Sequence, residues 1–405
     1  MARVLFLTQL LPYPLVSGAK IRAYYVLRHL ASKHQVTLLS FIRPDDRPED
    51  IAHLERFLET VQTLPIQRSW LRNVRAGAVG LATGRPMTIV REEIGTMQRR
   101  VRQLLATGAF DVVHADQIPM AQYGLLAPEA GGKRLLDQHN ATFRLVDRLA
   151  SNEPRWWVRQ MLQREAQAFA WYETKVCQRY DYVSFVAEED RRDLLGRMAP
   201  GALAGRNVVI PICVDPQAVQ PVIPSQRPWR VTHIGTMFWP PNAEGVVWFW
   251  EEVWPQVRAQ MPQSRLTIIG KNPPQHIQAL DESRDVDVLG FVDDLSPYLA
   301  ETAVFIVPLL AGGGMRVKIL DAWSWGLPIV STSIGAEGIR FRQGQEILIA
   351  DTPQAFARAT CQLMDNPALR ERMRANGRAW LEDRYDWQRV YPAWDEVYAR
   401  LVGDT

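Results

Sequence analysis

The sequence predicts an α/β protein with two domains, each containing a mostly parallel sheet covered by helices on both faces. Three observations lead to this prediction. Short apolar runs alternate with helical stretches through the first half of the chain, a pattern typical of parallel strands joined by crossover helices. A proline-rich pause at 214–228 interrupts this alternation, which restarts at Arg230. The length of 405 residues also suits two domains better than a single core.

The first half begins with an apolar run that we interpret as a buried strand and not as a signal peptide, because it lacks a basic flank and a cleavage site and contains two prolines. Further apolar runs follow and predict strands of the same sheet, while the longer periodic stretches between them predict helices. The expected strands are 4–7, 36–41, 61–66, 112–114, 134–136, 182–186 and 208–210. The expected helices are 19–32, 51–60, 87–105 and 154–179.

The second half repeats the pattern after the pause. It predicts strands at 230–234, 265–269, 286–289, 303–307, 328–331 and 346–349, with a helix near 243–260. The tail, 367–402, reads as helical and is rich in Arg and Trp. Open α/β sheets of this kind bind ligands at the carboxyl ends of their strands.

The segment 303–339 carries the strongest functional signal. An apolar strand runs into Gly312, Gly313 and Gly314, and a helix is expected to begin with Met315, Arg316, Val317 and Lys318. Free backbone N–H groups and the positive end of a helix make such a turn an anion site. Two cations in the first turn and Asp321 farther along suit a nucleotide diphosphate, with the phosphates at the glycines and the ribose hydroxyls at the acid.

This segment resembles the donor site of the retaining glycosyltransferases of family 4, whose members often show two glutamates eight residues apart. The second acid of that motif falls on Asp321, and Gly313 occupies the place of the first. The resemblance implies the GT-B fold, in which two Rossmann-like domains face each other across a cleft and the last helix returns to the first domain. We therefore expect an acceptor-side domain at 1–213 joined by residues 385–405, a linker at 214–228, and a donor domain at 229–384.

Other turns match the family's pattern and are expected to contact the donor or the acceptor. The loop before the first helix holds Gly18, with Lys20 and Arg22 as candidate phosphate contacts, and 233–242 resembles the family's segment against the nucleotide, with Asn242 also a candidate helix cap. Each of these residues has an ordinary structural interpretation as well, as a turn residue or a solvated side chain. The resemblance implies donor contacts for Gly18, Gly235, Thr236, Lys271, Gly312, Gly313, Gly314, Met315, Asp321 and Glu337.

The segment 111–117 resembles the family's D-V-V-H-x-H motif. It supplies His114, but Asp116 stands where the second histidine is expected. His139, in a D-x-H-N turn, is preferred to His114 as the histidine near the reacting sugar, although a single histidine is more often structural than catalytic. The expected catalytic residues are Arg316, Lys318, His139 and Asp116, with no metal ligand among them.

Composition excludes some classes and leaves one question open. Cys177, Cys213 and Cys361 are far apart and form no metal or disulfide pattern, which favours a reducing cytoplasm. Residues 1–200 hold 28 Lys and Arg against 21 Asp and Glu, whereas the rest hold 19 against 23. Arginines at 68, 72, 75, 85, 91, 99, 100 and 102, interleaved with apolar residues such as Trp70 and Leu71, suit either an anionic membrane surface or a solvated helix face. No nucleic-acid module is recognisable.

The function expected from these features is transfer of a sugar from a nucleotide-diphosphate sugar to a hydroxyl of a glycan or lipid-linked acceptor. The resemblance implies that the reaction is retaining and independent of a metal, with the donor as substrate and no further cofactor. The location expected is the cytoplasm, at the inner face of the membrane if the basic segment binds lipid. Two alternatives stay open: a nucleotide-sugar epimerase of the same fold, and an inactive scaffold that has lost the first acid at Gly313.

Overall fold

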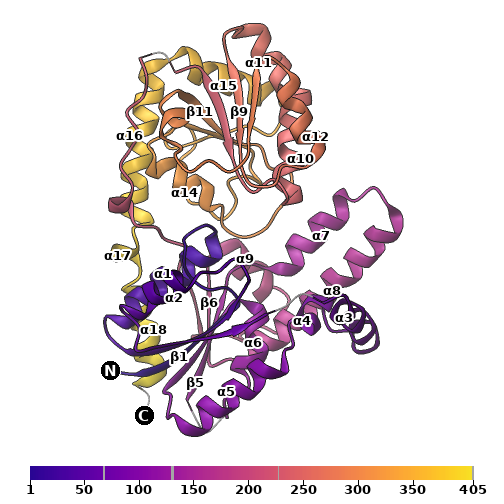
Figure 1. Cartoon of the computed structure of the whole chain (residues 1–405), viewed down its shortest axis with the longest axis vertical. Helices are drawn as coiled ribbons and strands as arrows, with labels where there is room; N and C mark the ends of the chain where they lie inside the picture. The colour runs from indigo at the N-terminus through magenta and orange to yellow at the C-terminus, as the bar shows by residue number, and fades with distance from the viewer. Residues whose placement is uncertain (67–68, 129–131, 227, 404–405) are drawn as a thin grey trace. The chain divides into compact units, whose positions relative to one another are not determined.

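The computed structural model describes residues 1–66, 69–128, 132–226 and 228–403. The chain forms two compact units, which are described separately (Figure 1). The first unit comprises Met1–Val214, Gly313–Met315 and the C-terminal segment from Trp387. The second unit comprises Asp215–Gly312 and Arg316–Asp386.

The first unit contains a seven-stranded parallel sheet with the order β3-β2-β1-β4-β5-β6-β7. Each strand is a short, mostly apolar run, and the interior strand β1 is paired with β2 and β4, with Val4 opposite both Val36 and Val112. All the strands expected from the first half are present, so this part of the fold prediction is confirmed. The strands are β1 (Arg3–Thr8), β2 (Gln35–Ile42), β3 (Thr60–Pro65), β4 (Val112–Asp116), β5 (Lys133–Gln138), β6 (Tyr182–Phe185) and β7 (Asn207–Val209).

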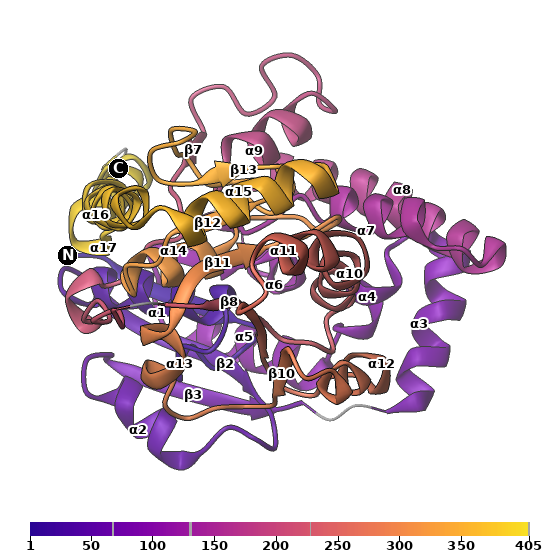
Figure 2. The ribbon, with the colours of Figure 1, turned by 90° about the horizontal axis from the view of Figure 1, so that it is seen from above.

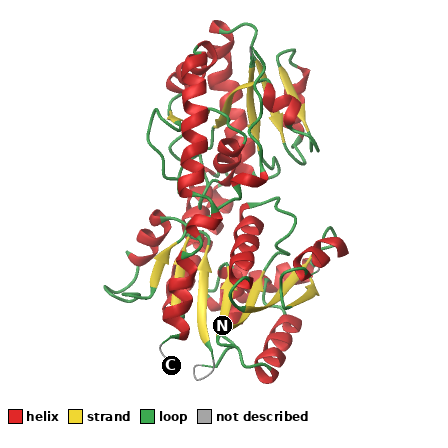
Figure 3. Cartoon of the chain, turned by 90° about the vertical axis from the view of Figure 1, so that its left-hand side faces the viewer, coloured by secondary structure: helices red, strands yellow, loops and turns green. Residues whose placement is uncertain are grey.

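Helices flank this sheet on both sides (Figure 3). Several of them, notably α3, α6 and α7, were not predicted from the sequence. The helices are α1 (Gly18–Ala31), α2 (Pro48–Glu55), α3 (Trp70–Thr83), α4 (Met87–Arg91), α5 (Gly95–Thr107), α6 (Ile118–Gly124), α7 (Thr142–Asn152), α8 (Trp156–Gln178), α9 (Glu188–Leu195), α17 (Trp387–Val390) and α18 (Ala393–Val402).

The single helix expected at 87–105 is two helices, because a side chain from another element interrupts it. The hydroxyl of Tyr123, on α6, donates to the carbonyl of Glu92 and accepts from the backbone N–H of Ile94, the second at 2.8 Å. These backbone groups bond to the phenol, and α5 starts afresh at Gly95.

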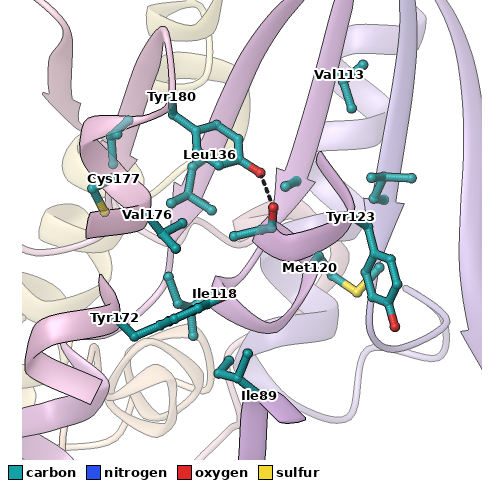
Figure 4. Close-up of a cluster of buried hydrophobic side chains, with 14 of the residues drawn as sticks. Ile89, Val113, Ile118, Met120, Tyr123, Leu136, Tyr172, Val176, Cys177 and Tyr180 are labelled. Atoms are coloured by element: carbon teal, nitrogen blue, oxygen red, sulfur yellow. Dashed lines mark hydrogen bonds between the residues drawn. The ribbon is translucent and has the colours of Figure 1, made fainter. Parts of the chain in front are cut away.

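The core of the first unit lies between the sheet and α4, α6 and α8, as Figure 4 shows. Val113 and Leu136 extend from adjacent strands and are fully buried with Ile118 and Met120. The hydroxyl of Tyr180 satisfies the carbonyl of Ala121 at 2.8 Å, so a buried polar group does not go unpaired there (Figure 4).

The second unit contains a six-stranded parallel sheet with the order β10-β9-β8-β11-β12-β13, and Figure 2 shows its strands and helices from above. Its strands are β8 (Arg230–Ile234), β9 (Arg265–Ile269), β10 (Val286–Leu289), β11 (Thr302–Val307), β12 (Ile329–Ser331) and β13 (Leu348–Ile349). Its α-helices are α10 (Pro240–Trp248), α11 (Trp254–Gln260), α12 (Gln275–Gln278), α13 (Ser296–Ala300), α14 (Val317–Ser324), α15 (Pro353–Asp365) and α16 (Pro367–Arg384). The short helical turns η1 (Pro216–Ala218), η2 (Phe249–Val253) and η3 (Ala279–Glu282) complete the elements.

Two helices of the second unit differ from the sequence prediction. The stretch 243–260 is divided by the π-helical turn η2, because Pro255 has no N–H to continue the α-helical ladder. The helix expected to begin at Met315, α14, begins instead at Val317, so Met315 precedes it and Arg316 takes the N-cap position with non-helical backbone angles.

The segment predicted as a linker begins where the contact pattern changes from the first unit to the second, at Asp215. It is bonded to the second unit through Arg378, which donates to the carbonyls of Pro216 and Val219, and through Arg374, which donates to Val222. Residue 227 of the expected linker lies outside the described residues. The C-terminal segment groups with the first unit from Trp387, and its His29–Asp395 contact measures 2.9 Å.

Candidate functional site

Glycines allow two adjacent strands of the second unit to approach closely at their carboxyl ends. A Cβ on Gly270, after β9, would lie 1.7 Å from the carbonyl oxygen of Gly235, which follows β8. The backbone N–H of Gly235 donates to the carbonyl of Ile269 at 3.0 Å. A side chain is therefore excluded at Gly270. The backbone at the carboxyl ends of β8 and β9 carries no side chain at these two glycines, and this is the edge where open sheets bind ligands.

Lys318 reaches this edge from α14. Its Nζ donates to Oδ1 of Asn242 at 2.8 Å, and Nδ2 of the same amide donates to the carbonyl of Thr236 at 2.9 Å. A Cβ on Gly235 would lie 2.8 Å from that Nζ, so the glycine leaves the space that the lysine occupies. Asn242 is inside α10, which begins at Pro240, so the cap interpretation of Asn242 is wrong.

Arg316 is held in the same way by a second glycine. Its guanidinium is buried and packs on Gly312, where a Cβ would lie 2.5 Å from Nη2. Gly312 has a φ of 142°, a conformation that side chains with a Cβ rarely adopt. The glycine turn thus brings the arginine to the start of α14, as the sequence predicted.

Three ionisable groups on and before α14 influence one another. Burial and the charge of Arg316 lower the pKa of Lys318 to about 7, although Asp321 opposes the shift. Burial raises the pKa of Asp321 to about 7, although Lys318 opposes that shift. His233, at the end of β8, is fully buried and donates from Nδ1 to the Ile306 carbonyl at 3.0 Å, while burial and Lys318 hold its pKa well below the usual range. At neutral pH an amine with a pKa of about 7 is only partly protonated. An anion that binds beside it raises this pKa and so increases the positive charge that the amine offers to the anion.

The other predicted donor residues are placed less closely. Thr236 is exposed next to Gly235, and Lys271 is exposed with its ammonium 4.4 Å from the ring centre of Phe291. Glu337 is half-buried in the turn after β12. Gly313, Gly314 and Met315 group with the first unit by their contacts.

The first unit contains a second cluster, at the carboxyl ends of β4 and β5. Nε2 of His139 lies 2.9 Å from Oδ1 of Asp116 and 3.5 Å from Oδ2 of Asp137. Arg22, on α1, forms a two-pronged ion pair with Asp137, with distances of 2.9 and 3.1 Å, and donates to the carbonyl of Pro211 at 2.6 Å. All these side chains are buried.

The cluster keeps its histidine charged. Burial alone would lower the pKa of His139, but Asp116 and Asp137 outweigh burial and raise the pKa to about 9. Burial would also raise the pKa of Asp137, yet Arg22 and His139 hold it well below its usual range. At neutral pH His139 is therefore an imidazolium, which can donate a proton or a hydrogen bond but cannot act as a base.

Asp116, Asp137 and His139 are also the group of described residues whose ligand atoms lie within 4.8 Å of one another, close enough to hold a metal ion. Charge in this group is already balanced by protein cations, because the guanidinium of Arg22 binds both oxygens of Asp137. The donor set therefore fits an ion-pair network better than a metal centre.

The structure corrects the interpretation of Arg22 and places three other candidates of the first unit. Arg22, considered for an acceptor phosphate, is fully buried and bonded to Asp137. Lys20 pairs with Asp46 at 3.3 Å. His114 bonds through Nδ1 to the Tyr398 hydroxyl at 2.9 Å, and burial lowers its pKa to about 3, so it is a neutral core residue, as the preference for His139 implied. Gly18 opens α1 behind the cap residue Ser17.

Sequence reasoning missed Asp137 as a partner of His139, and Arg22 as the partner of Asp137. Asp137 stands two residues before His139 at the end of an apolar strand, a signal that could have found it. The pairing of Arg22 with Asp137, 115 residues away, has no local signal.

Comparison with known proteins agrees with this fold. The chain matches the family models Glycosyltransferase Family 4 over residues 16–218 and Glycosyl transferases group 1 over residues 228–366. Curated relatives include an uncharacterized 44.6 kDa protein in the cps region of Klebsiella pneumoniae, 28% identical over 40% of this chain and 44% of that protein. A GDP-mannose-dependent monoacylated alpha-(1-6)-phosphatidylinositol monomannoside mannosyltransferase of Corynebacterium glutamicum is 31% identical over 33% of this chain and 38% of its own. The match thus spans less than half the length of each of these relatives.

Solved structures share the fold at low identity. Anabaena HepE, in complex with UDP and glucose, superposes with a TM-score of 0.67 at 15% identity and covers 98% of this chain and 100% of its own. WaaG, a glycosyltransferase involved in lipopolysaccharide biosynthesis, gives a TM-score of 0.60 at 12% identity and covers 97% and 99%. The fold is therefore that of the GT-B glycosyltransferases. With a family model matching residues 16–218 and a second matching residues 228–366, the chain belongs to the family 4 glycosyltransferases.

Proposed function

We propose that the protein transfers a sugar from a nucleotide-diphosphate donor to a hydroxyl of a glycan or lipid-linked acceptor. Family membership supports the reaction class. The observation that carries the proposal is the cluster of Lys318, Asn242 and Arg316 around Gly235 and Gly312 at the carboxyl edge of the second sheet. Two cations beside glycine-lined backbone are what a diphosphate requires.

Lys318 and Arg316 act on the leaving group in this proposal. Negative charge builds on the departing phosphate oxygen as the bond to the sugar breaks, and fixed cations stabilise that charge without reorganising. Such preorganised donors contribute on the order of 3–4 kcal/mol each. These two cations supply the charge that a metal would otherwise provide, so we propose metal-independent transfer, with retention of configuration as the family implies. Asp321 is assigned to the ribose hydroxyls.

The first unit is assigned to the acceptor. His139, held as an imidazolium by Asp116 and Asp137, donates a hydrogen bond to a sugar or acceptor oxygen and is not the base that activates the acceptor hydroxyl. No helix of the described residues is long and apolar enough to cross a membrane. The arginine-rich segment of the first unit supports a cytoplasmic enzyme that meets a lipid-linked acceptor at an anionic membrane surface.

The test is transfer from a panel of radiolabelled nucleotide sugars to lipid and glycan extracts. UDP-glucose and GDP-mannose come first, because HepE was solved with UDP and glucose and the Corynebacterium relative is GDP-mannose-dependent. We expect label in an acceptor and release of the nucleoside diphosphate. A new nucleotide sugar formed from donor alone would indicate the epimerase alternative, and donor binding without any turnover would indicate the inactive scaffold.

A further inference from the structure

Helix α3 of the first unit is amphipathic in the reverse of the usual sense. Soluble proteins turn the apolar stripe of a surface helix towards the core. In α3 the stripe of Trp70, Val74 and Leu81, spaced to fall on one face, points outward, with Trp70 71% and Leu81 66% exposed. Leu71 flanks this stripe and is exposed as well.

The small residues of α3 fix this orientation. Ala76 and Gly80 form its inner face and are buried. A Cβ on Gly80 would lie 2.9 Å from Cγ of Met87, so the helix lies too close to α4 for a larger residue. Because Nη2 of Arg164, on α8, also donates to the Gly80 carbonyl at 2.7 Å, α3 cannot rotate to bury its stripe without losing these contacts.

Helix α8 extends the exposed apolar surface. Figures 1 and 2 both show α3 beside α8. The first turns of α8 expose Trp156, Trp157 and Met161, and Trp156 is 74% exposed. Trp171 returns to within about 60° of the direction of Trp156 at 3.6 residues per turn, and it is exposed too. We name this surface, made by Trp70, Leu71, Val74, Leu81, Trp156, Trp157, Met161 and Trp171, the tryptophan face.

The charges around the tryptophan face are mostly positive. Neither α3 nor residues 155–164 contain an acidic side chain, whereas they contain Arg72, Arg75, Arg155, Arg159 and Arg164. Glu153, just before α8, pairs with Arg155 at 2.7 Å, so the excess positive charge comes from the other arginines. Trp171 also lines a surface cavity of about 560 Å³ together with Lys175 and Arg197, and the residues described as lining it include no acid. Of the arginines expected from the sequence, Arg68 lies outside the described residues.

We propose that the tryptophan face docks on an anionic lipid bilayer, with α3 and the start of α8 lying in the headgroup region. Trp rings favour the boundary between headgroups and acyl chains, and a helix with an apolar stripe flanked by arginines lies in that plane. Arginines beside the stripe would contact lipid phosphates, since a flanking cation gains about fivefold in binding at such a surface. This proposal names the membrane partner in the proposed function, but its evidence is the surface itself and does not depend on the transfer chemistry.

The experiment is sedimentation of the full chain with vesicles at low salt. We expect binding to phosphatidylglycerol–phosphatidylcholine vesicles at about a 3:7 molar ratio and loss of binding with phosphatidylcholine alone or at high salt. The triple variant Trp70→Ser, Val74→Ser, Leu81→Ser should lower the partition coefficient roughly tenfold or more. Arg75→Glu should lower it by a similar factor at low salt. The control Ile223→Ser changes an equally exposed apolar residue of the second unit and should bind as the wild type does.

Circular dichroism and melting curves establish that each variant is folded. Wild-type protein that ignores acidic vesicles, or a triple variant that binds them unchanged, overturns the proposal. Sedimentation velocity tests whether a second copy of the chain occupies the face instead. If the wild type dimerises without binding vesicles, and the triple variant is monomeric, the face is a dimer interface and the proposal is overturned. Nucleoside diphosphate binding is measured on the same proteins. Vesicle binding without nucleotide binding would refute the proposed function and support the docking of the tryptophan face. Nucleotide binding without vesicle binding would refute the docking and support the proposed function.

Discussion

The charged state of His139 predicts an unusual pH dependence of stability. Its ring lies 2.9 Å from Asp116 and 3.5 Å from Asp137, with the latter also paired to Arg22. The two carboxylates outweigh the effect of burial and raise the pKa of His139 from 6.5 to about 9. Because each pKa unit corresponds to about 1.4 kcal/mol, the bound proton contributes about 3 kcal/mol to the free energy of unfolding.

The sign follows from the direction of the pKa change. A group whose pKa is higher in the folded state stabilises fully below its unfolded value, here 6.5, and loses that contribution as the pH rises towards 9. The variant His139→Gln lacks the charge at every pH. The difference in unfolding free energy between wild type and His139→Gln should therefore shrink by about 3 kcal/mol between neutral pH and pH values above 9.

Urea denaturation of both proteins across this range measures the difference. His114→Gln is the matched control, because burial lowers the pKa of His114 to about 3 and the ring is neutral in both states above pH 7. Its effect on stability should stay constant over the same range. A constant difference for His139→Gln, or a ring that titrates near 6.5 by NMR, would refute the ion-pair network.

The remaining predictions concern the second unit. Gly235→Ala places a Cβ 2.8 Å from Nζ of Lys318 and 2.9 Å from Nδ2 of Asn242. Both groups must shift, so diphosphate affinity should fall more than stability does. Gly77→Ala, with nothing within 4 Å, is the control. Asp321→Asn should weaken nucleotide binding with an intact circular dichroism spectrum. It should not destabilise the protein above pH 7, because burial raises the pKa of Asp321 to about 7 and disfavours its charged form. Early melting with unchanged nucleotide affinity would show that Asp321 has a structural role instead. Since burial and Arg316 lower the pKa of Lys318 to about 7, a bound diphosphate should draw a proton onto it at alkaline pH. Calorimetry in buffers of different ionisation enthalpy would detect this uptake, which Lys318→Arg should abolish; equal heats for the wild type would contradict it.

The fold could be predicted from the sequence because its strands are continuous apolar runs. Parallel strands covered on both faces, such as β1 and β11, contain little else, and the turns after them are marked by glycine. Helices were harder to predict. The apolar stripe of α3 has the spacing of a core-facing stripe, so the sequence alone does not show that it points outward, and the break between α4 and α5 depends on a hydroxyl that Tyr123 brings from another element.

The candidate site also contains residues that the local sequence predicts and partners that it does not. Arg316, Lys318 and Asp321 lie within one turn and helix, so local spacing was enough to find them. Their partners come from distant parts of the chain, since Asn242 is 76 residues from Lys318 and Arg22 is 115 residues from Asp137. Only the structure shows that Lys318 bonds to the amide of Asn242 and that the guanidinium of Arg22 is paired with Asp137 and is not available to a substrate.

Binding of nucleoside diphosphates to the second unit's cluster tests the central claim most directly. Isothermal titration of UDP and GDP into the wild type and into Lys318→Ala, at one pH near 7, compares the cluster with and without the ammonium that lies 2.8 Å from Asn242. We predict that at least one of the two nucleotides binds the wild type and that Lys318→Ala binds it about tenfold or more weakly, as expected when a charged hydrogen-bond donor is removed. Equal affinity of the two proteins, or a wild type that binds neither nucleotide, would contradict the assignment of this cluster to the donor.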